Sequence, residues 1–189
     1  MNLFLRIVLV WIKALFRRRI GILEAFESDF TVWWTDQDAL RHVTNSRFFS
    51  LTDVCVIDYF LRARVWKALQ RNGWFPLIVY EDMHFHKPLR YPSKFRVRTQ
   101  FLGWDEERII ASHRFMRGET LIAAGYTVAR FVDKKGKAVP VSVVAAALKA
   151  PVPPPLPAEA GAVMERSRGA AAASLAASSV SGAAEKLVL

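Results

Sequence analysis

The sequence predicts an α+β domain built from about five antiparallel strands and one long buried helix. The segment from Phe48 to Trp66 is long and mostly apolar, and residues 54–57 are apolar at four successive positions. Apolar groups then point in every direction around the helix axis, which is typical of a buried helix. After Gly73 the chain alternates apolar and polar residues between turns, as half-buried antiparallel strands do. Strands combined with a single central helix place the chain in the α+β class.

Composition divides the chain into three parts. It has 189 residues, 52% of them hydrophobic, which is enough for one domain with a real core. We expect an amphipathic helix over residues 1–20, the domain over residues 21–150 and a flexible tail over residues 151–189. The tail opens with five prolines in seven residues, and Ala, Ser and Gly dominate it afterwards. Such a composition predicts no apolar face that would hold the tail on a core.

The net charge of +10 is unevenly distributed along the chain. The first 20 positions hold five of the 27 basic residues and no acidic one. This pattern suits a protein beside anionic lipid, or one that handles a polyanionic ligand such as coenzyme A. The sequence contains no recognised nucleic-acid-binding module, so we expect no nucleic-acid partner. The one cysteine, Cys55, excludes an internal disulfide and agrees with a reducing, cytoplasmic location.

Residues 1–20 predict a helix with a narrow basic stripe and a wide apolar face. At 100° per residue the stripe spans about 60° and consists of Asn2, Arg6, Lys13 and Arg17. The helix is too short and too charged for a transmembrane span. We expect a peripheral helix on an anionic membrane surface, on the inner face of a membrane. The alternative is a helix packed on this protein or on a second copy of it.

A strand at residues 28–34 leads into a polar loop that is the first candidate site. Asp36, Asp38 and His42 lie in this connection, where catalytic groups are often found. Asn45 or Ser46 then caps the long helix. The unpaired N–H groups at such a helix start can stabilise an oxyanion, and a nearby carboxylate can act as a base or nucleophile.

Further along the helix, Ser46, Ser50 and Asp53 are spaced four and three apart and share one side. Asp53 therefore faces either the active-site cavity or solvent. The four later strands are expected at residues 77–87, 94–101, 108–117 and 121–133, followed by a short closing helix at residues 139–149. His84 and His86 share a strand face, but no third ligand has suitable spacing, so we expect neither a metal nor a cofactor.

The loop resembles the signature of the hotdog-fold acyl-CoA thioesterases of the 4-hydroxybenzoyl-CoA thioesterase-like superfamily. In that signature an acid precedes a Gly-His-Val-Asn-Asn-like run and an aromatic residue. The matching positions here are Asp38, His42, Asn45 and Phe48. Arg41 replaces the usual glycine, and Thr44 replaces the first asparagine. Residues 101–106 resemble the strand-turn segment of the thioesterase-superfamily member six branch and its bacterial relatives, and the whole resemblance covers roughly residues 28–145.

The resemblance implies a sheet wrapped around the central helix and hydrolysis of acyl-CoA or acyl-carrier-protein thioesters. It implies Asp38 as general base or nucleophile, the helix start as the oxyanion site, and Asp53 as a further acid. His42 and Asn45 would fix the loop. The residues expected to contact substrate are Ser46, Arg47, Phe48, Lys87 and Arg90, with the three cations suited to coenzyme A phosphates.

The resemblance also implies a homodimer or a dimer of dimers. Because Arg41 and Thr44 depart from the signature, a second function stays open. In that alternative the protein has lost hydrolysis and serves as a membrane-associated acyl-ligand-binding or interaction module. A dehydratase of the same fold fits less well, since the matching arrangement of a histidine and a helix glutamate is missing from the sequence.

Overall fold

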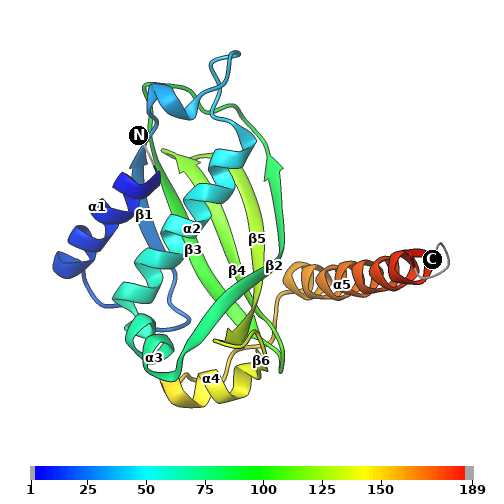
Figure 1. Cartoon of the computed structure of the whole chain (residues 1–189). Helices are drawn as coiled ribbons and strands as arrows, with labels where there is room; N and C mark the ends of the chain where they lie inside the picture. The colour runs from blue at the N-terminus through cyan, green and yellow to red at the C-terminus, as the bar shows by residue number, and fades with distance from the viewer. Residues whose placement is uncertain (1–2, 186–189) are drawn as a thin grey trace.

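The computed structural model describes the backbone of residues 3–185 and the side chains of residues 3–171. Its centre is an antiparallel sheet with the strand order β1-β3-β4-β5-β2, and the short β6 pairs with β5 (Figure 1). The strands are β1 (Phe26–Thr31), β2 (Trp74–Phe85), β3 (Lys94–Trp104), β4 (Ile109–Arg117), β5 (Thr120–Asp133) and β6 (Ala138–Val139). The predicted α+β class and the sheet around a central helix are confirmed.

Five α-helices and a short 3-10 helix complete the described chain. They are α1 (Leu3–Phe16), η1 (Trp34–Asp36), α2 (Asn45–Arg62), α3 (Val65–Asn72), α4 (Val141–Leu148) and α5 (Ala158–Glu185). The long helix expected to reach Trp66 is interrupted, because Arg64 takes a left-handed conformation with φ of 60° between α2 and α3. Residue periodicity does not reveal such a break.

Helix α2 lies along one face of the sheet and forms the core with it (Figure 1). Near its start, Phe48, Leu51 and Cys55 pack with buried residues of β3 and β4. Near its end, Tyr59 and Phe60 pack with residues of β3 and β5. Each fully buried large side chain contributes roughly 1.5–3 kcal/mol. These contacts hold the start of α2, and the loop before it, in a fixed place.

Helix α1 is amphipathic as expected, but Arg6 and Arg17 of its basic stripe face the protein. It packs beside α2, with Arg6, Val10 and Ala14 buried. Just after the helix, the Arg17 guanidinium donates to the buried carboxylate of Asp58 at 3.0 Å. Arg6 and Arg17 of the stripe therefore bind acids of the domain and are not available to lipid headgroups. Lys13 of the stripe is exposed, and Asn2 lies outside the described residues. This orientation corrects the expectation that the stripe meets an anionic membrane.

The expected flexible tail is wrong for residues 158–171, which pack on the face of the sheet opposite α2. Ala160, Val163 and Met164 follow helical spacing and are buried against Ile110 and Val128 of the sheet. Side chains of small and medium size are sufficient to hold the helix on the sheet, because the strands beneath it present apolar residues. Beyond this contact α5 projects away from the sheet (Figure 1).

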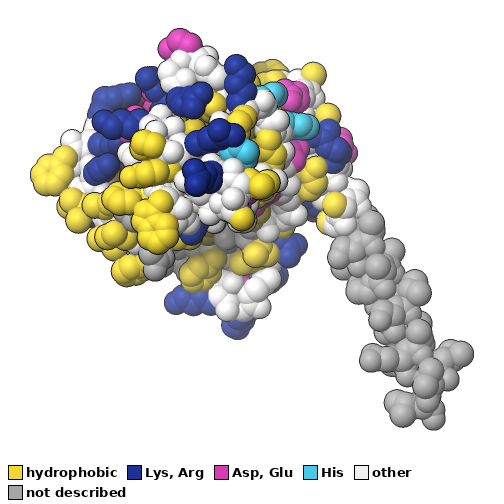
Figure 2. All heavy atoms as spheres, turned by 90° about the horizontal axis from the view of Figure 1, so that it is seen from above, with side chains coloured by type: hydrophobic (Ala, Val, Ile, Leu, Met, Phe, Trp, Pro, Cys, Tyr) yellow, Lys and Arg dark blue, Asp and Glu magenta, His cyan; other side chains and the backbone are white. Residues whose placement is uncertain are grey.

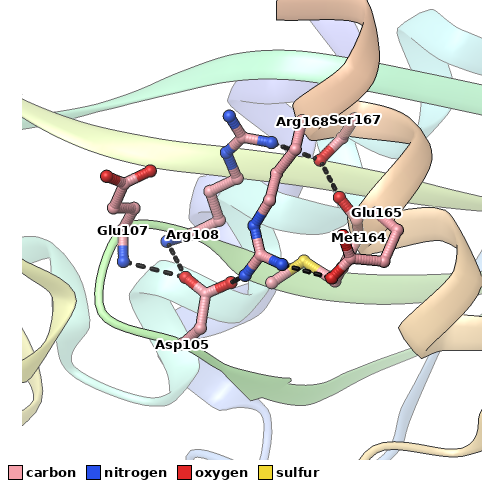
Figure 3. Close-up of polar contacts among 7 residues, drawn as sticks. All are labelled: Asp105, Glu107, Arg108, Met164, Glu165, Ser167 and Arg168. Carbon is pink, nitrogen blue, oxygen red and sulfur yellow. Dashed lines mark hydrogen bonds and ion pairs between the residues drawn. The ribbon is translucent and has the colours of Figure 1, made fainter.

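Polar contacts also tie the start of α5 to the turn between β3 and β4 (Figure 3). Arg108 donates to the Ser167 hydroxyl at 2.7 Å, and Arg168 donates to the Asp105 carboxylate at 2.5 Å. The Asp105 carboxylate in turn accepts the backbone N–H of Arg108 at 2.8 Å. The first turns of α5 are thus part of the folded domain.

Candidate active site

The two acids of the signature loop have different roles. The Asp36 carboxylate is buried, accepts the backbone N–H of Trp33 at 2.8 Å, and forms an ion pair with Arg6. The Arg47 guanidinium lies 3.6 Å from the other Asp36 oxygen. Burial lowers the pKa of Arg6, an effect that the Asp36 charge opposes. Asp36 is therefore enclosed by cations and joins the loop to α1.

Asp38 instead shapes the loop and stays exposed. Its Oδ1 accepts the backbone N–H of Leu40 at 2.8 Å and that of His42 at 3.2 Å. The backbone closes the same turn, since the Asp38 N–H donates to the His42 carbonyl at 2.9 Å. Within the part of the chain that the structure describes, no hydrogen bond reaches Oδ2. This oxygen is open to a water molecule or a substrate.

Arg41 takes the conformation for which glycine is usual at its position. Its φ is 60°, in the left-handed region. For a residue with a Cβ this conformation costs about 1–2 kcal/mol. The substitution of arginine for glycine has thus left the turn intact and added local strain.

The His42 ring connects the loop to the segment between β2 and β3. Its Nε2 lies 2.6 Å from a guanidinium nitrogen of Arg90. The Val43 N–H donates to the carbonyl of Leu89 at 2.8 Å. Lys87 is exposed in the same segment. The structure therefore brings together His42 and Arg90, two residues predicted separately, beside the loop.

The start of α2 offers backbone donors. Thr44 occupies the N-cap position but makes no side-chain capping bond. The N–H groups of Asn45 and Ser46 have no acceptor among the described residues, while that of Arg47 donates to the Thr44 carbonyl at 2.9 Å. Free donors at a helix start can bind an oxyanion. The Asn45 side chain has no described partner either, so its expected part in fixing the loop stays a prediction.

Phe48 lies in the core. It is 3% exposed and its ring contacts those of Phe85 and Phe115 at centroid distances of 5.1 and 5.0 Å. The expected direct contact of Phe48 with substrate is therefore replaced by a supporting role beneath the loop.

A separate cleft of about 310 Å³ opens between α2 and the sheet. Asp53 lines it, and the other lining groups are almost all apolar. Across it, Glu81 of β2 accepts the Thr127 hydroxyl at 3.0 Å, and the Thr52 hydroxyl lies 3.5 Å away. Burial raises the pKa of Asp53; burial and then the Asp53 charge raise the pKa of Glu81.

Glu81 was missed by the sequence analysis, although the sequence carries a signal for it. In the alternating strand β2, Glu81 falls two positions before Met83 and four before Phe85, and both of these pack toward α2. An acid on the apolar side of a strand points to a function or a buried partner. Here the partners are hydroxyl groups, and a second acid lies near by.

The comparisons with known proteins decide the family. The family model of the thioesterase-like superfamily matches residues 32–161, well over half of the chain. The chain belongs to the thioesterase-like superfamily.

Members and solved structures similar to this chain agree on the fold. Protein THEM6 of Xenopus laevis is 27% identical over 81 residues, 43% of this chain and 39% of that protein. The matched stretch thus spans less than half of that relative. The probable thioesterase YbaW of Escherichia coli superposes with a TM-score of 0.61 at 14% identity, covering 65% of this chain and 96% of that one.

A second solved structure is also similar to this chain. Slr0204 of Synechocystis, a 1,4-dihydroxy-2-naphthoyl-CoA thioesterase, gives a TM-score of 0.57 at 14% identity, over 68% of this chain and 100% of that one. At these identities the structures establish the hotdog fold alone.

In this thioesterase-like chain a second apolar pocket lies next to the cleft. The pocket of about 40 Å³ shares Phe60, Phe101 and Ile109 with the cleft, and Val144 and Leu148 of α4 line it further along. This second pocket reaches the apolar face of α4. It is lined by side chains suited to a hydrocarbon chain.

The remaining titratable groups of this thioesterase-like domain are structural. His113 is buried, its Nδ1 lies 3.0 Å from the Thr99 hydroxyl, and burial lowers its pKa to about 3. Burial raises the pKa of Cys55 to about 12, so the thiol is not a nucleophile. His84 and His86 are exposed, and the described residues contain no group of His, Cys, Asp and Glu that could hold a metal ion.

Proposed function

We propose that this protein hydrolyses acyl-CoA or acyl-carrier-protein thioesters with Asp38 as general base or nucleophile. One observation carries the proposal. The exposed carboxylate of Asp38 belongs to the same short loop that ends in the free N–H groups of Asn45 and Ser46. An acid and an oxyanion site are the two groups that acyl transfer needs. Membership of the thioesterase-like superfamily supports this assignment.

In the general-base form of the reaction, Asp38 takes a proton from water as the water oxygen attacks the thioester carbonyl carbon. The carbonyl oxygen becomes an oxyanion and is bound by the N–H groups at the start of α2, where each donor is typically worth ~3 kcal/mol. The carbon–sulfur bond then breaks, and the leaving thiolate takes up the proton. The products are a carboxylic acid and a free thiol.

The acyl group would occupy the apolar cleft between α2 and the sheet. Asp53 lines that cleft, and Glu81 accepts a hydrogen bond from Thr127, which lines it too. The raised pKa values of the two acids are typical of groups placed for function. Asp53 is proposed as a second acid that orients water or the thioester. Arg47, Lys87 and Arg90 are proposed to contact the phosphates of coenzyme A.

A homodimer is proposed to form through β2. This strand is at the edge of the sheet, so one row of its backbone groups has no strand partner. Four large apolar side chains of the strand are exposed, namely Phe75, Leu77, Ile78 and Phe85. Long apolar edge strands associate unless they are covered. A second copy pairing along β2 would cover this edge close to Glu81.

The test is turnover of a panel of acyl-CoA thioesters by the purified full-length protein. The panel includes short and long aliphatic chains and aromatic acyl groups, because solved structures with this fold include an aromatic-acyl-CoA thioesterase. Hydrolysis of at least one class above the uncatalysed rate is expected.

A protein that binds these thioesters without turnover would instead be an acyl-ligand-binding or interaction module. The departures from the signature at Arg41 and Thr44 are what keep this alternative open.

A further inference from the structure

The outer face of helix α1 is apolar over its whole length. Because Arg6, Val10 and Ala14 face the protein, the opposite side of the helix looks outward. The exposed residues there carry no charge and include Leu5, Leu9, Trp11, Ile12, Leu15 and Phe16. Figure 2 shows hydrophobic side chains gathered on the side of the molecule where α1 lies, with lysine and arginine side chains beside them.

An apolar face of this size is unusual on a water-exposed surface. Leu15 and Phe16 keep 73% and 85% of their surface exposed. Contiguous exposed patches of this kind mark contact with another protein or with a membrane. The face bears no hydrogen-bonding side chain apart from the indole of Trp11, whereas specific protein interfaces make about one hydrogen bond per 100–200 Å².

The charges beside α1 favour a membrane over a second copy. Lys13 is exposed on α1 and Arg19 follows three residues after its end, and neither forms an ion pair with a carboxylate within residues 3–171. Arg19 donates to the Leu61 carbonyl at 3.0 Å, which leaves its charge uncompensated. Two copies meeting through this face would bring like charges together. Anionic headgroups would instead attract them, each cation near the surface adding to binding.

We propose that the outer face of α1 docks on an anionic lipid bilayer while Arg6 and Arg17 of its basic stripe remain bound to the domain. The stripe holds the helix to the protein, through Arg6 on Asp36 and Arg17 on Asp58. The outer side chains then enter the boundary between headgroups and acyl chains, as those of interfacial helices do. No helix among the described residues is long and apolar enough to cross a membrane. This surface acts independently of whether the cleft hydrolyses thioesters.

Docking in this way fixes the signature loop near the bilayer. Asp36 binds α1 directly and lies two residues from Asp38. The helix and the loop therefore move as one body, and membrane binding would set the orientation of the candidate active site.

The test is co-sedimentation of the full-length protein with vesicles of phosphatidylcholine that contain 30% phosphatidylserine. The test variant carries Ile12→Gln, Leu15→Gln and Phe16→Gln, which keep the helix and the stripe. The control variant carries Val143→Gln and Val152→Gln, which remove exposed apolar groups elsewhere. Circular dichroism checks that all three proteins are folded.

The wild type and the control are expected to pellet with the vesicles, partly so at high salt because apolar contacts are not screened. The test variant is expected to bind at least tenfold more weakly. Wild type that stays in the supernatant overturns the proposal, and so does a test variant that pellets like wild type. Equal binding to pure phosphatidylcholine removes the role of anionic lipid. Loss of oligomers in the test variant, with no vesicle binding by wild type, assigns the face to a second copy.

Discussion

The Arg6 guanidinium and the Asp36 carboxylate form an ion pair with only 4% and 5% of their side-chain surface exposed. The pair joins the first helix of the chain to the loop that carries Asp38. Its two members are thirty residues apart in the sequence. The N-terminal helix is therefore a built-in part of the domain that supports the candidate active site.

Replacing Arg6 with methionine is expected to destabilise the protein by about 3–5 kcal/mol, because it leaves the buried Asp36 carboxylate short of its main partner. Urea unfolding followed by circular dichroism measures the change. Lys13→Met is the matched control on the same helix, since Lys13 is exposed, and it should stay within about 0.5 kcal/mol of wild type. A loss below 1 kcal/mol for Arg6→Met would mean that the pair does not hold the helix.

The buried His113 predicts a loss of stability in mild acid. Its pKa in the folded protein is about 3, below the ordinary value of 6.5. Between these two pH values the imidazole is protonated in the unfolded chain and neutral in the folded one. The contribution of His113 to the free energy of unfolding is complete above pH 6.5. It falls as the pH drops toward 3, by up to about 1.4 kcal/mol per pH unit.

The His113 prediction is measured by urea unfolding at several pH values. His113→Asn should flatten the curve between pH 6.5 and 4, while His84→Asn, at an exposed position, should leave it unchanged. Parallel curves for wild type and His113→Asn would contradict the assignment.

The position of Asp53 in the cleft predicts that its removal stabilises the protein but lowers its activity. Asp53 has a raised folded pKa, so its charged form at pH 7 slightly disfavours the folded state. Asp53→Asn is therefore expected to raise the melting temperature slightly and to lower kcat/KM at least tenfold. Ser50→Ala, one turn earlier on the same side of α2, serves as control. Unchanged kcat/KM in Asp53→Asn would make the acid a surface group.

Because the edge strand β2 is exposed and apolar, we expect a dimer through β2 that a charged residue introduced on this strand will dissociate. Leu77→Lys places a charge on the apolar edge of β2 in both copies and should give a monomer by light scattering at micromolar concentration. Tyr91→Lys changes an equally exposed position outside the strand and should leave the dimer intact. A wild type that is monomeric and fully active would refute the dimer.

Local pattern predicted much of this fold. The four apolar residues 54–57 correctly indicated a buried helix, and the alternation around Phe95 and Val97 correctly indicated a strand. These features depend on residues that are neighbours in the sequence, so local sequence patterns are enough to predict them.

The features that were missed depend on distant partners. The basic stripe turns inward because Asp36 and Asp58, far along the chain, accept its charges. Residues 158–171 pack because Ile110 and Val128 present an apolar outer face to them. The relation of Glu81 to Asp53 likewise arises only when β2 lies beside α2.

Turnover by Asp38→Asn is the most direct test of the proposed hydrolysis. Asparagine keeps an Oδ1 acceptor for the N–H groups of Leu40 and His42, so the loop should stay folded. The variant cannot take a proton from water or attack a carbonyl as a carboxylate. With the best acyl-CoA of the panel, its kcat is expected to fall at least ~100-fold at unchanged circular dichroism. A folded variant with kcat near that of wild type would show that Asp38 is not the catalytic acid.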